Sequence, residues 1–309
     1  MNTYKRGLIY AFAASFISGI SIWLNKYALG TISSPVLLTT SKNILVGVAF
    51  LSLLIIAGKL RKIFELPRKD LLKLVLISLV GGSIPFYLFF SGLASTSAIN
   101  AAIIQKTLVI WVAVFATYFL KEKISVLGVL AVTLLFLGNI HVGGFKGFSF
   151  SNGEVMILVA TFLWAIESIL AKKVLKNIEV EIVAAFRMGL GSVVLLSLML
   201  IQNTSSILTI SSFGYEQYLW LGITAVLLFG YVYTWYKAVS MAPVVAVTSV
   251  LVVSTLITNV LSAVFVTHTW TEGMMTQAAI LAIGVLLAYA AFNKLDLKQK
   301  ENIVADGRA

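Results

Sequence analysis

The chain has 309 residues, of which 60% are hydrophobic and 11% are charged, and its mean hydropathy is +1.00. A soluble domain has about 25% charged residues, so this composition excludes a soluble enzyme and indicates an all-α integral membrane protein. The formal net charge of +11 does not indicate a nucleic-acid partner, because most basic residues lie in short connections beside apolar segments. Cysteine is absent, which excludes disulfides and thiolate metal sites.

Ten apolar segments follow one another along the chain, and each can cross a hydrocarbon core of about 30 Å as a helix. We expect transmembrane helices over residues 7–29, 34–58, 71–93, 96–120, 124–143, 153–175, 180–202, 215–241, 243–267 and 272–292. The first segment could be mistaken for a signal peptide, but its apolar run continues to Leu29 without a convincing cleavage site. It is therefore predicted to be a retained helix.

Basic residues are concentrated in alternate connections between these helices. They are Lys5 and Arg6; Lys59, Arg61, Lys62, Arg68, Lys69 and Lys73; Lys121 and Lys123; Lys172, Lys173 and Lys176; and the last residues from Lys294 to Arg308. The other side carries little beyond Lys26 and Lys146. The positive-inside rule therefore predicts a multi-pass protein of the inner (plasma) membrane with both termini in the cytoplasm and the lipid bilayer as its surroundings.

The two halves of the chain repeat one another at a shift of about 146 positions. The shift aligns Gly7 with Gly153, Phe16 with Phe162, Lys26 with Lys172, Tyr87 with Tyr233, and Gly138 with Gly284. We predict one five-helix repeat over residues 1–146, a second over residues 147–292, and a cytoplasmic tail over residues 293–309. Because five helices are an odd number, the second copy enters the membrane inverted, an arrangement that characterises secondary transporters with a midplane site.

Two stretches carry a resemblance to a known family. The stretch AASFISGISIWLNKYAL is repeated as VATFLWAIESILAKKVL, and VFATYFLKEKISVLGVLAVTLLFLGNI is similar to a passage from helix 4 to helix 5 of that family. The chain resembles the ten-helix EamA-type carriers of the drug/metabolite transporter superfamily, although His268 stands where the first copy has Glu122. The resemblance implies a carrier, often an exporter, of small organic metabolites, whose cavity is lined by helices 1, 3, 4, 6, 8 and 9.

One lysine, Lys106, falls near the middle of the fourth predicted helix, in the segment INAAIIQKTLVIW. Exposing a lysine at the bilayer centre costs about 2.5–3.5 kcal/mol, so the side chain is expected to face the interior of the bundle. We predict that its ammonium binds an anionic group of the substrate, with help from Asn100, Gln105 and Thr107. The alternative is a structural ion pair with Glu167, which could instead bind a substrate ammonium or carry a coupling proton.

Other polar and aromatic residues occupy repeat-related helix faces that lipid would not favour. The predicted substrate-binding set is completed by Ser21, Tyr87, Trp111, Trp164, Tyr233, Tyr236 and Asn259. The aromatic faces could also be ordinary packing or belts at the membrane interface.

Three further residues are predicted to act in gating. Lys42 and Arg187 lie about two turns inside their helices, where they either line the mouths of the cavity or extend to the interface. Pro85 interrupts the third helix, either as a tolerated kink or as a hinge for alternating access.

These features favour a secondary transporter of an amino acid or amino-acid-like zwitterion that works by alternating access. The runner-up substrate is an anionic or nucleotide-derived metabolite such as S-adenosylmethionine, and the rival classes are a membrane-embedded enzyme and a scaffold. No catalytic or cofactor motif is present, and two histidines do not make a metal site, so we expect neither cofactor nor metal. The direction of transport, a coupling proton and the oligomeric state stay open.

Overall fold

A computed structural model describes residues 3–32, 34–93, 95–96, 98–140, 147–202 and 209–305. Throughout this described part, the regular elements are helices. Among the described residues, nine helical segments are long and apolar enough to cross a membrane, and α8 is a shorter apolar helix of 15 residues. The all-α class and the ten predicted helices are confirmed. The predicted boundary at residue 146 lies outside the described residues.

Several of the ten membrane segments are made of more than one helix. In chain order they are α1 (Thr3–Thr31); α2 (Pro35–Ile56); α4 (Arg68–Gly82) with α5 (Ile84–Leu93); α6 (Ala98–Lys106) with α7 (Leu108–Phe115) and the π turn η1 (Ala116–Leu120); α8 (Val126–Ile140); α9 (Asn152–Val174); α10 (Val180–Ala185) with the π turn η2 (Phe186–Leu190) and α11 (Gly191–Gln202); α13 (Tyr215–Met241); α14 (Val244–Leu251) with α15 (Val253–Ser262) and the π turn η4 (Ala263–Thr267); and α16 (Glu272–Ala305). Two short helices connect segments: α3 (Leu60–Phe64) and the 3-10 turn η3 (Thr209–Ser212).

Local chemistry explains where several helices begin and break. Ser34 precedes α2 and its hydroxyl accepts a hydrogen bond from the backbone N–H of Leu37, while Ser151 caps α9 in the same way. The third segment breaks at Ser83, two residues before Pro85, because proline has no backbone N–H to continue the helical ladder. The hydroxyl of Ser83 donates to the carbonyl oxygens of the preceding turn and so completes the break inside the protein.

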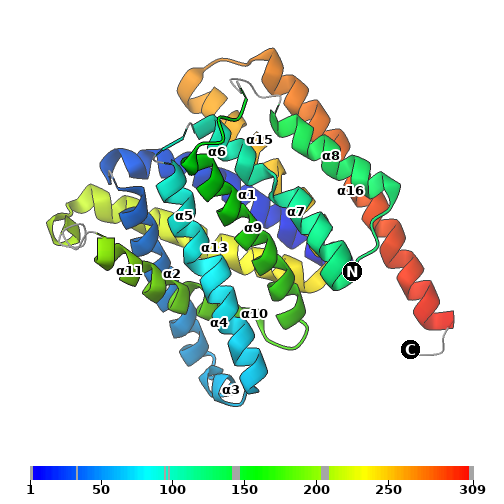
Figure 1. Cartoon of the computed structure of the whole chain (residues 1–309), viewed down its shortest axis with the longest axis horizontal. Helices are drawn as coiled ribbons and strands as arrows, with labels where there is room; N and C mark the ends of the chain where they lie inside the picture. The colour runs from blue at the N-terminus through cyan, green and yellow to red at the C-terminus, as the bar shows by residue number, and fades with distance from the viewer. Residues whose placement is uncertain are drawn as a thin grey trace.

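The helices pack in pairs that the repeat relates to one another. Helix α1 of the first repeat packs along α13 of the second. Its counterpart in the second repeat, α9, packs along α4 and α5 of the first. Likewise, α1 contacts α14 and α15, whereas α9 contacts α6 and α7. The remaining counterparts pack against each other: α2 against η2 and α11, and α8 against α16, which lie side by side in Figure 1. The two copies therefore build one bundle, and its largest helix interfaces join one copy to the other.

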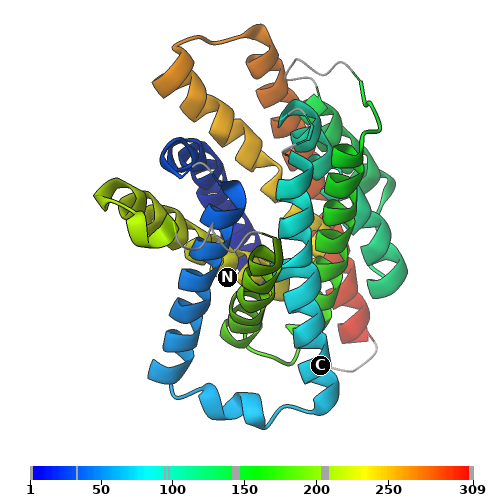
Figure 2. The ribbon, with the colours of Figure 1, turned by 60° about the vertical axis from the view of Figure 1, so that its left-hand side comes forward.

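The two membrane sides of the bundle are packed differently. We call the side that carries α3, the residue 121–125 connection and the residue 175–179 connection the basic side; in Figure 2, α3 lies at one end and the η4–α16 connection at the other. On the basic side α14 packs against α7. Their repeat counterparts, α6 and α15, are not a packed pair of the described helices. The bundle is therefore closed on the basic side and less closed on the opposite side.

Close backbone contact between the repeats predicts a sensitive glycine at the end of α4. A Cβ atom at Gly82 would lie 2.0 Å from the carbonyl oxygen of Arg187. We expect Gly82→Ala to lower the free energy of unfolding by about 1–3 kcal/mol, as overpacking does. Thermal unfolding of the purified protein in detergent measures the change. Gly222→Ala is the matched control, because nothing lies within 4 Å of that site; equal stability of the two variants would contradict the predicted contact.

Candidate functional site

A buried polar cluster joins three helices from the second repeat. Glu167 of α9, Arg187 of η2 and Tyr236 of α13 are 2%, 5% and 0% exposed. The Tyr236 hydroxyl donates to Oε1 of Glu167 at 2.6 Å, and Nε of Arg187 lies 3.7 Å from the same oxygen. The Arg187 guanidinium also lies 5.8 Å from the ring centroid of Tyr236. The carboxylate of Glu167 is therefore neutralised by Arg187, and the ion pair with Lys106 that the sequence left open is not formed.

Glycine and a π turn explain why this cluster fits inside the bundle. A Cβ atom at Gly81 would lie 2.3 Å from Cγ of Glu167, so only glycine lets α4 approach the carboxylate. The turn containing Arg187 is a π turn, a local widening of the helix that is frequent at functional sites. Extension of Arg187 to the interface, one sequence alternative, is wrong, because its side chain is buried against a carboxylate.

A second polar cluster occupies the matching place in the first repeat. Lys42 of α2 is 8% exposed, and its Nζ donates to Oδ1 of Asn25 at 3.2 Å. The amide of Asn25 donates in turn to the hydroxyl of Ser21 at 3.3 Å. The predicted inward face of α1 therefore meets α2, and extension of Lys42 to the membrane interface is also wrong. A gating role of Lys42 stays a prediction.

Lys106 differs from these charges because its side chain has no partner in the part of the chain that the structure describes. It ends α6 at a break in the fourth segment, it is half-buried, and among the described residues it makes no hydrogen bond or ion pair. Beside it the indole N–H of Trp111 donates to Oγ1 of Thr107 at 3.0 Å, and the Trp111 ring lies 4.1 Å from that of Phe162. Gln105 is half-buried in the last turn of α6. Lys106, Gln105, Thr107 and Trp111 thus form one local group.

Several of the remaining predicted residues bind partners outside that group. Asn100 lies near the start of α9, where its amide donates to Oε1 of Glu154 at 2.5 Å. Asn259 donates to Oε1 of Gln277 in α16 at 2.8 Å. Trp164 donates to the carbonyl oxygen of Gly81 at 3.3 Å and packs against phenylalanine rings of α5. Tyr87 and Pro85 lie on α5, half-buried and buried, respectively.

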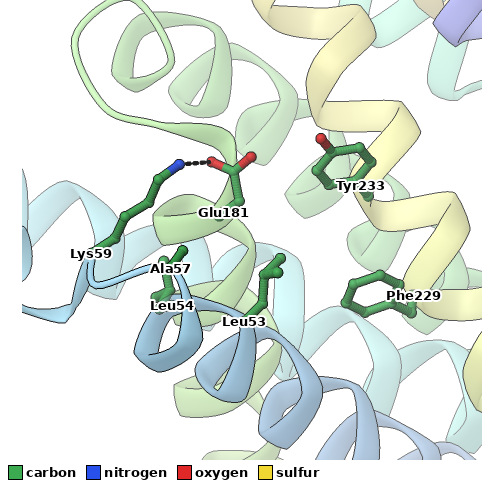
Figure 3. Close-up of a pocket in the computed structure, with 7 residues that line it drawn as sticks. All are labelled: Leu53, Leu54, Ala57, Lys59, Glu181, Phe229 and Tyr233. Carbon is green, nitrogen blue, oxygen red and sulfur yellow. Dashed lines mark ion pairs between the residues drawn. The ribbon is translucent and has the colours of Figure 1, made fainter.

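Tyr233 lines a pocket on the basic side that the sequence did not predict. The pocket has a volume of about 300 Å³ and is lined by Leu53, Leu54, Ala57, Lys59, Glu181, Phe229 and Tyr233 (Figure 3). Lys59 lies 3.6 Å from Glu181 and 2.5 Å from Glu179, and Lys237 lies 3.4 Å from Glu181. Hydrogen bonding to Lys59 holds the pKa of Glu179 below its usual value. The pocket is thus edged by an ionic network that joins the α2–α3 connection to the start of α10 and to α13.

Fold and site first define a class: a multi-pass membrane protein of two inverted five-helix repeats with polar clusters buried between helices. The model of the EamA-like transporter family matches residues 5–143 and 151–290, so the chain belongs to this family. The two matches also confirm the resemblance that the sequence carried.

Relatives and a solved structure agree with this assignment. The chain is 25% identical to an uncharacterized transporter of Methanothermobacter thermautotrophicus over 49% of this chain and 46% of that protein. It is 30% identical to one of Synechocystis over 44% of this chain and 42% of that protein. The chain thus spans less than half the length of these two relatives. One crystal structure superposes with a TM-score of 0.76 over 94% of this chain and 98% of the other, at 16% identity, and so shares the fold.

The Glu167 cluster makes a prediction about stability. Removing one member of a buried ion pair leaves an uncompensated charge and costs about 3–5 kcal/mol, whereas removing both charges costs much less. We expect Arg187→Met to lower the free energy of unfolding by about that amount and the double variant Arg187→Met/Glu167→Gln to regain most of it. Thermal unfolding in detergent measures both. Lys106→Met is the control, since an unpaired lysine leaves no partner behind; a double variant as unstable as the single one would refute the pair.

Proposed function

We propose that the chain is a secondary transporter that moves a small organic metabolite bearing a carboxylate across the membrane by alternating access. One observation carries the proposal: Lys106 is a cation inside a membrane segment, and its side chain has no partner among the described residues. Such a charge is costly unless water or a ligand meets it, and an ammonium is suited to bind a carboxylate. Membership of a family of transporters supports movement of a solute rather than its conversion.

The orientation follows from the basic residues and is part of the proposal. The positive-inside rule assigns the basic side to the cytoplasm, which places both termini there and the protein in the inner (plasma) membrane. The conformation described above is then closed toward the cytoplasm, because α7 and α14 pack together there. In this orientation the solute reaches Lys106 from the outer side.

Two kinds of carboxylate compound are candidates, and they differ in the protein groups that they need besides Lys106. An amino-acid-like zwitterion needs a group for its ammonium, and Glu167 is already occupied by Arg187 and Tyr236. Its ammonium would instead meet the amide oxygen of Gln105 or the face of Trp111. An anionic or nucleotide-derived metabolite needs only the cation and an aromatic wall, which favours this second class. S-adenosylmethionine, the nucleotide-derived example, carries a carboxylate for the anchor, but it also carries an ammonium and a sulfonium and therefore needs the same additional contact to Gln105 or Trp111 as the amino-acid zwitterion.

A coupling proton remains a prediction. Glu167 could carry it only in a state in which Arg187 and Tyr236 have left the carboxylate, because both now bind the same oxygen.

Transport into proteoliposomes tests the proposal against an enzyme or a scaffold. The purified protein is reconstituted and supplied in turn with radiolabelled amino acids, dicarboxylates and S-adenosylmethionine. We expect one of them to accumulate in the lumen chemically unchanged and to be displaced by unlabelled solute. Recovery of a converted product would indicate an enzyme, and the absence of movement of any carboxylate compound through folded protein would refute the proposed transporter.

Lys106→Ala tests the anchor itself. A ligand that binds the folded state raises the melting temperature, so a thermal-shift screen of the wild-type protein identifies carboxylate ligands. We expect Lys106→Ala to weaken binding of the best ligand by at least about tenfold, since a hydrogen bond to a charged group contributes about 1.5–3 kcal/mol. The melting temperature without ligand should stay unchanged. Lys106→Arg, which keeps the charge, is the control; unchanged affinity of Lys106→Ala would refute the anchor.

A further inference from the structure

On the basic side, a lysine of α9 and a glutamate of the η1–α8 connection hold the turn between α13 and α14. Nζ of Lys172 donates to the carbonyl oxygens of Val239 and Ala242 at 2.7 Å each. Oε1 of Glu122 accepts from the backbone N–H of Val244 at 3.2 Å. The lysine thus binds the C-terminal end of one helix and the carboxylate binds the N-terminal end of the next, which matches both helix dipoles. Because Lys172 belongs to α9, this contact ties α9 to α13.

A neighbouring contact to the α13–α14 turn has a repeat-related counterpart on the opposite side of the membrane. A Cβ atom at Gly7 would lie 2.8 Å from Cβ of Ala242, so α1 touches the turn directly. Its repeat counterpart, Gly153, does the same on the opposite side, where a Cβ would lie 2.7 Å from Oγ of Ser95. One glycine contact joins α1 to α13 and the other joins α9 to α5. Because both are present, the glycine contacts do not distinguish the closed side of the bundle from the open side.

The lysine contact, in contrast, is present on one side only among the described residues. The shift of 146 positions makes Lys26 the counterpart of Lys172, and Leu93 and Thr96 the counterparts of the two residues whose carbonyl oxygens Lys172 binds. Lys26 is exposed and, in the part of the chain that the structure describes, has no hydrogen bond or ion pair. The helices show the same asymmetry: Thr248 of α14 is 2% exposed, whereas its counterpart in α6, Ala102, is exposed.

We propose that Lys26 does on the opposite side what Lys172 does on the basic side: it binds a helix–helix turn when that side closes. We call each of these lysine contacts a latch and that of Lys26 the mirror latch. In that state Nζ of Lys26 donates to the carbonyl oxygens of Leu93 and Thr96, while Lys172 releases the α13–α14 turn. The two lysines are then used alternately, one in each state of the cycle. His268 stands where the first copy has Glu122, so the second latch lacks the acidic partner and depends on Lys26 alone. This inference rests on alternating access, which the proposed function supplies.

The absence of cysteine from the chain allows a direct test with one introduced thiol. Thr248→Cys places a thiol on the buried face of α14, and its labelling by 2-(trimethylammonium)ethyl methanethiosulfonate reports opening of the basic side. We expect Lys172→Gln to raise the labelling rate about 5- to 30-fold, the change that one or two kcal/mol makes in a two-state equilibrium. Adding Lys26→Gln to that variant should return the rate toward the wild-type value, because neither side then keeps its latch.

Controls separate the latch from a general effect of charge or stability. Lys5→Gln removes an exposed lysine of α1 and should leave the rate of the Lys172→Gln variant unchanged, and Lys26→Arg should do the same because it keeps the donor. If Lys172→Gln does not elute as a folded protein, Glu122→Ala replaces it as the variant that loosens the basic side. A rate that stays high when Lys26→Gln is added overturns the mirror latch. Because labelling needs no solute, this result is independent of the transport assay, whose failure would refute the proposed function alone.

Discussion

A charge or a backbone polar group inside a hydrocarbon layer needs a partner, and this constraint arranges the interior of the molecule. Arg187 and Tyr236 approach Glu167 from two different helices, and glycine at position 81 lets a third helix pass beside the carboxylate. Lys42 finds an amide of α1 in the same way. Polar contacts therefore help to hold α1 against α2, and α9 against η2 and α13.

The two polar clusters are repeat-related, although their chemistry differs. Glu167 is the counterpart of Ser21, and Arg187 lies one position from the counterpart of Lys42. In each half, a cation of the second helix of the repeat meets a polar face of the first helix. One half supplies a carboxylate for its cation, whereas the other supplies a neutral amide and a hydroxyl. The scaffold is thus duplicated, while the distribution of charge makes one half different from the other.

Hydropathy predicted the number of helices and their approximate ends, because these depend on composition along a single segment, and comparison of the two halves at a shift of 146 positions predicted the repeat. They did not predict α3, a helix of five residues in a basic connection. Pairing was less accessible still. Lys106 and Glu167 were both predicted to face the interior, but the side of a helix on which a residue lies does not tell how deep the residue is or which residue it binds. The π turn that contains Arg187 also departs from regular helical spacing, which the sequence did not predict. Asn100 and Asn259 were grouped with Lys106 for the same reason, although they bind Glu154 and Gln277.

The place of the break between α6 and α7 gives the unpaired lysine a physical rationale. On one side of the break, α7 packs against α14; on the other, α6 and α15, both described as helices, do not pack together. Lys106 is the last residue of α6 and so lies at the boundary between the packed half and the unpacked half. If the packed side and the unpacked side change roles during the transport cycle, a solute or water from either side of the membrane can still reach this boundary. A cation there needs no permanent partner, because water or a solute meets it from whichever side is open.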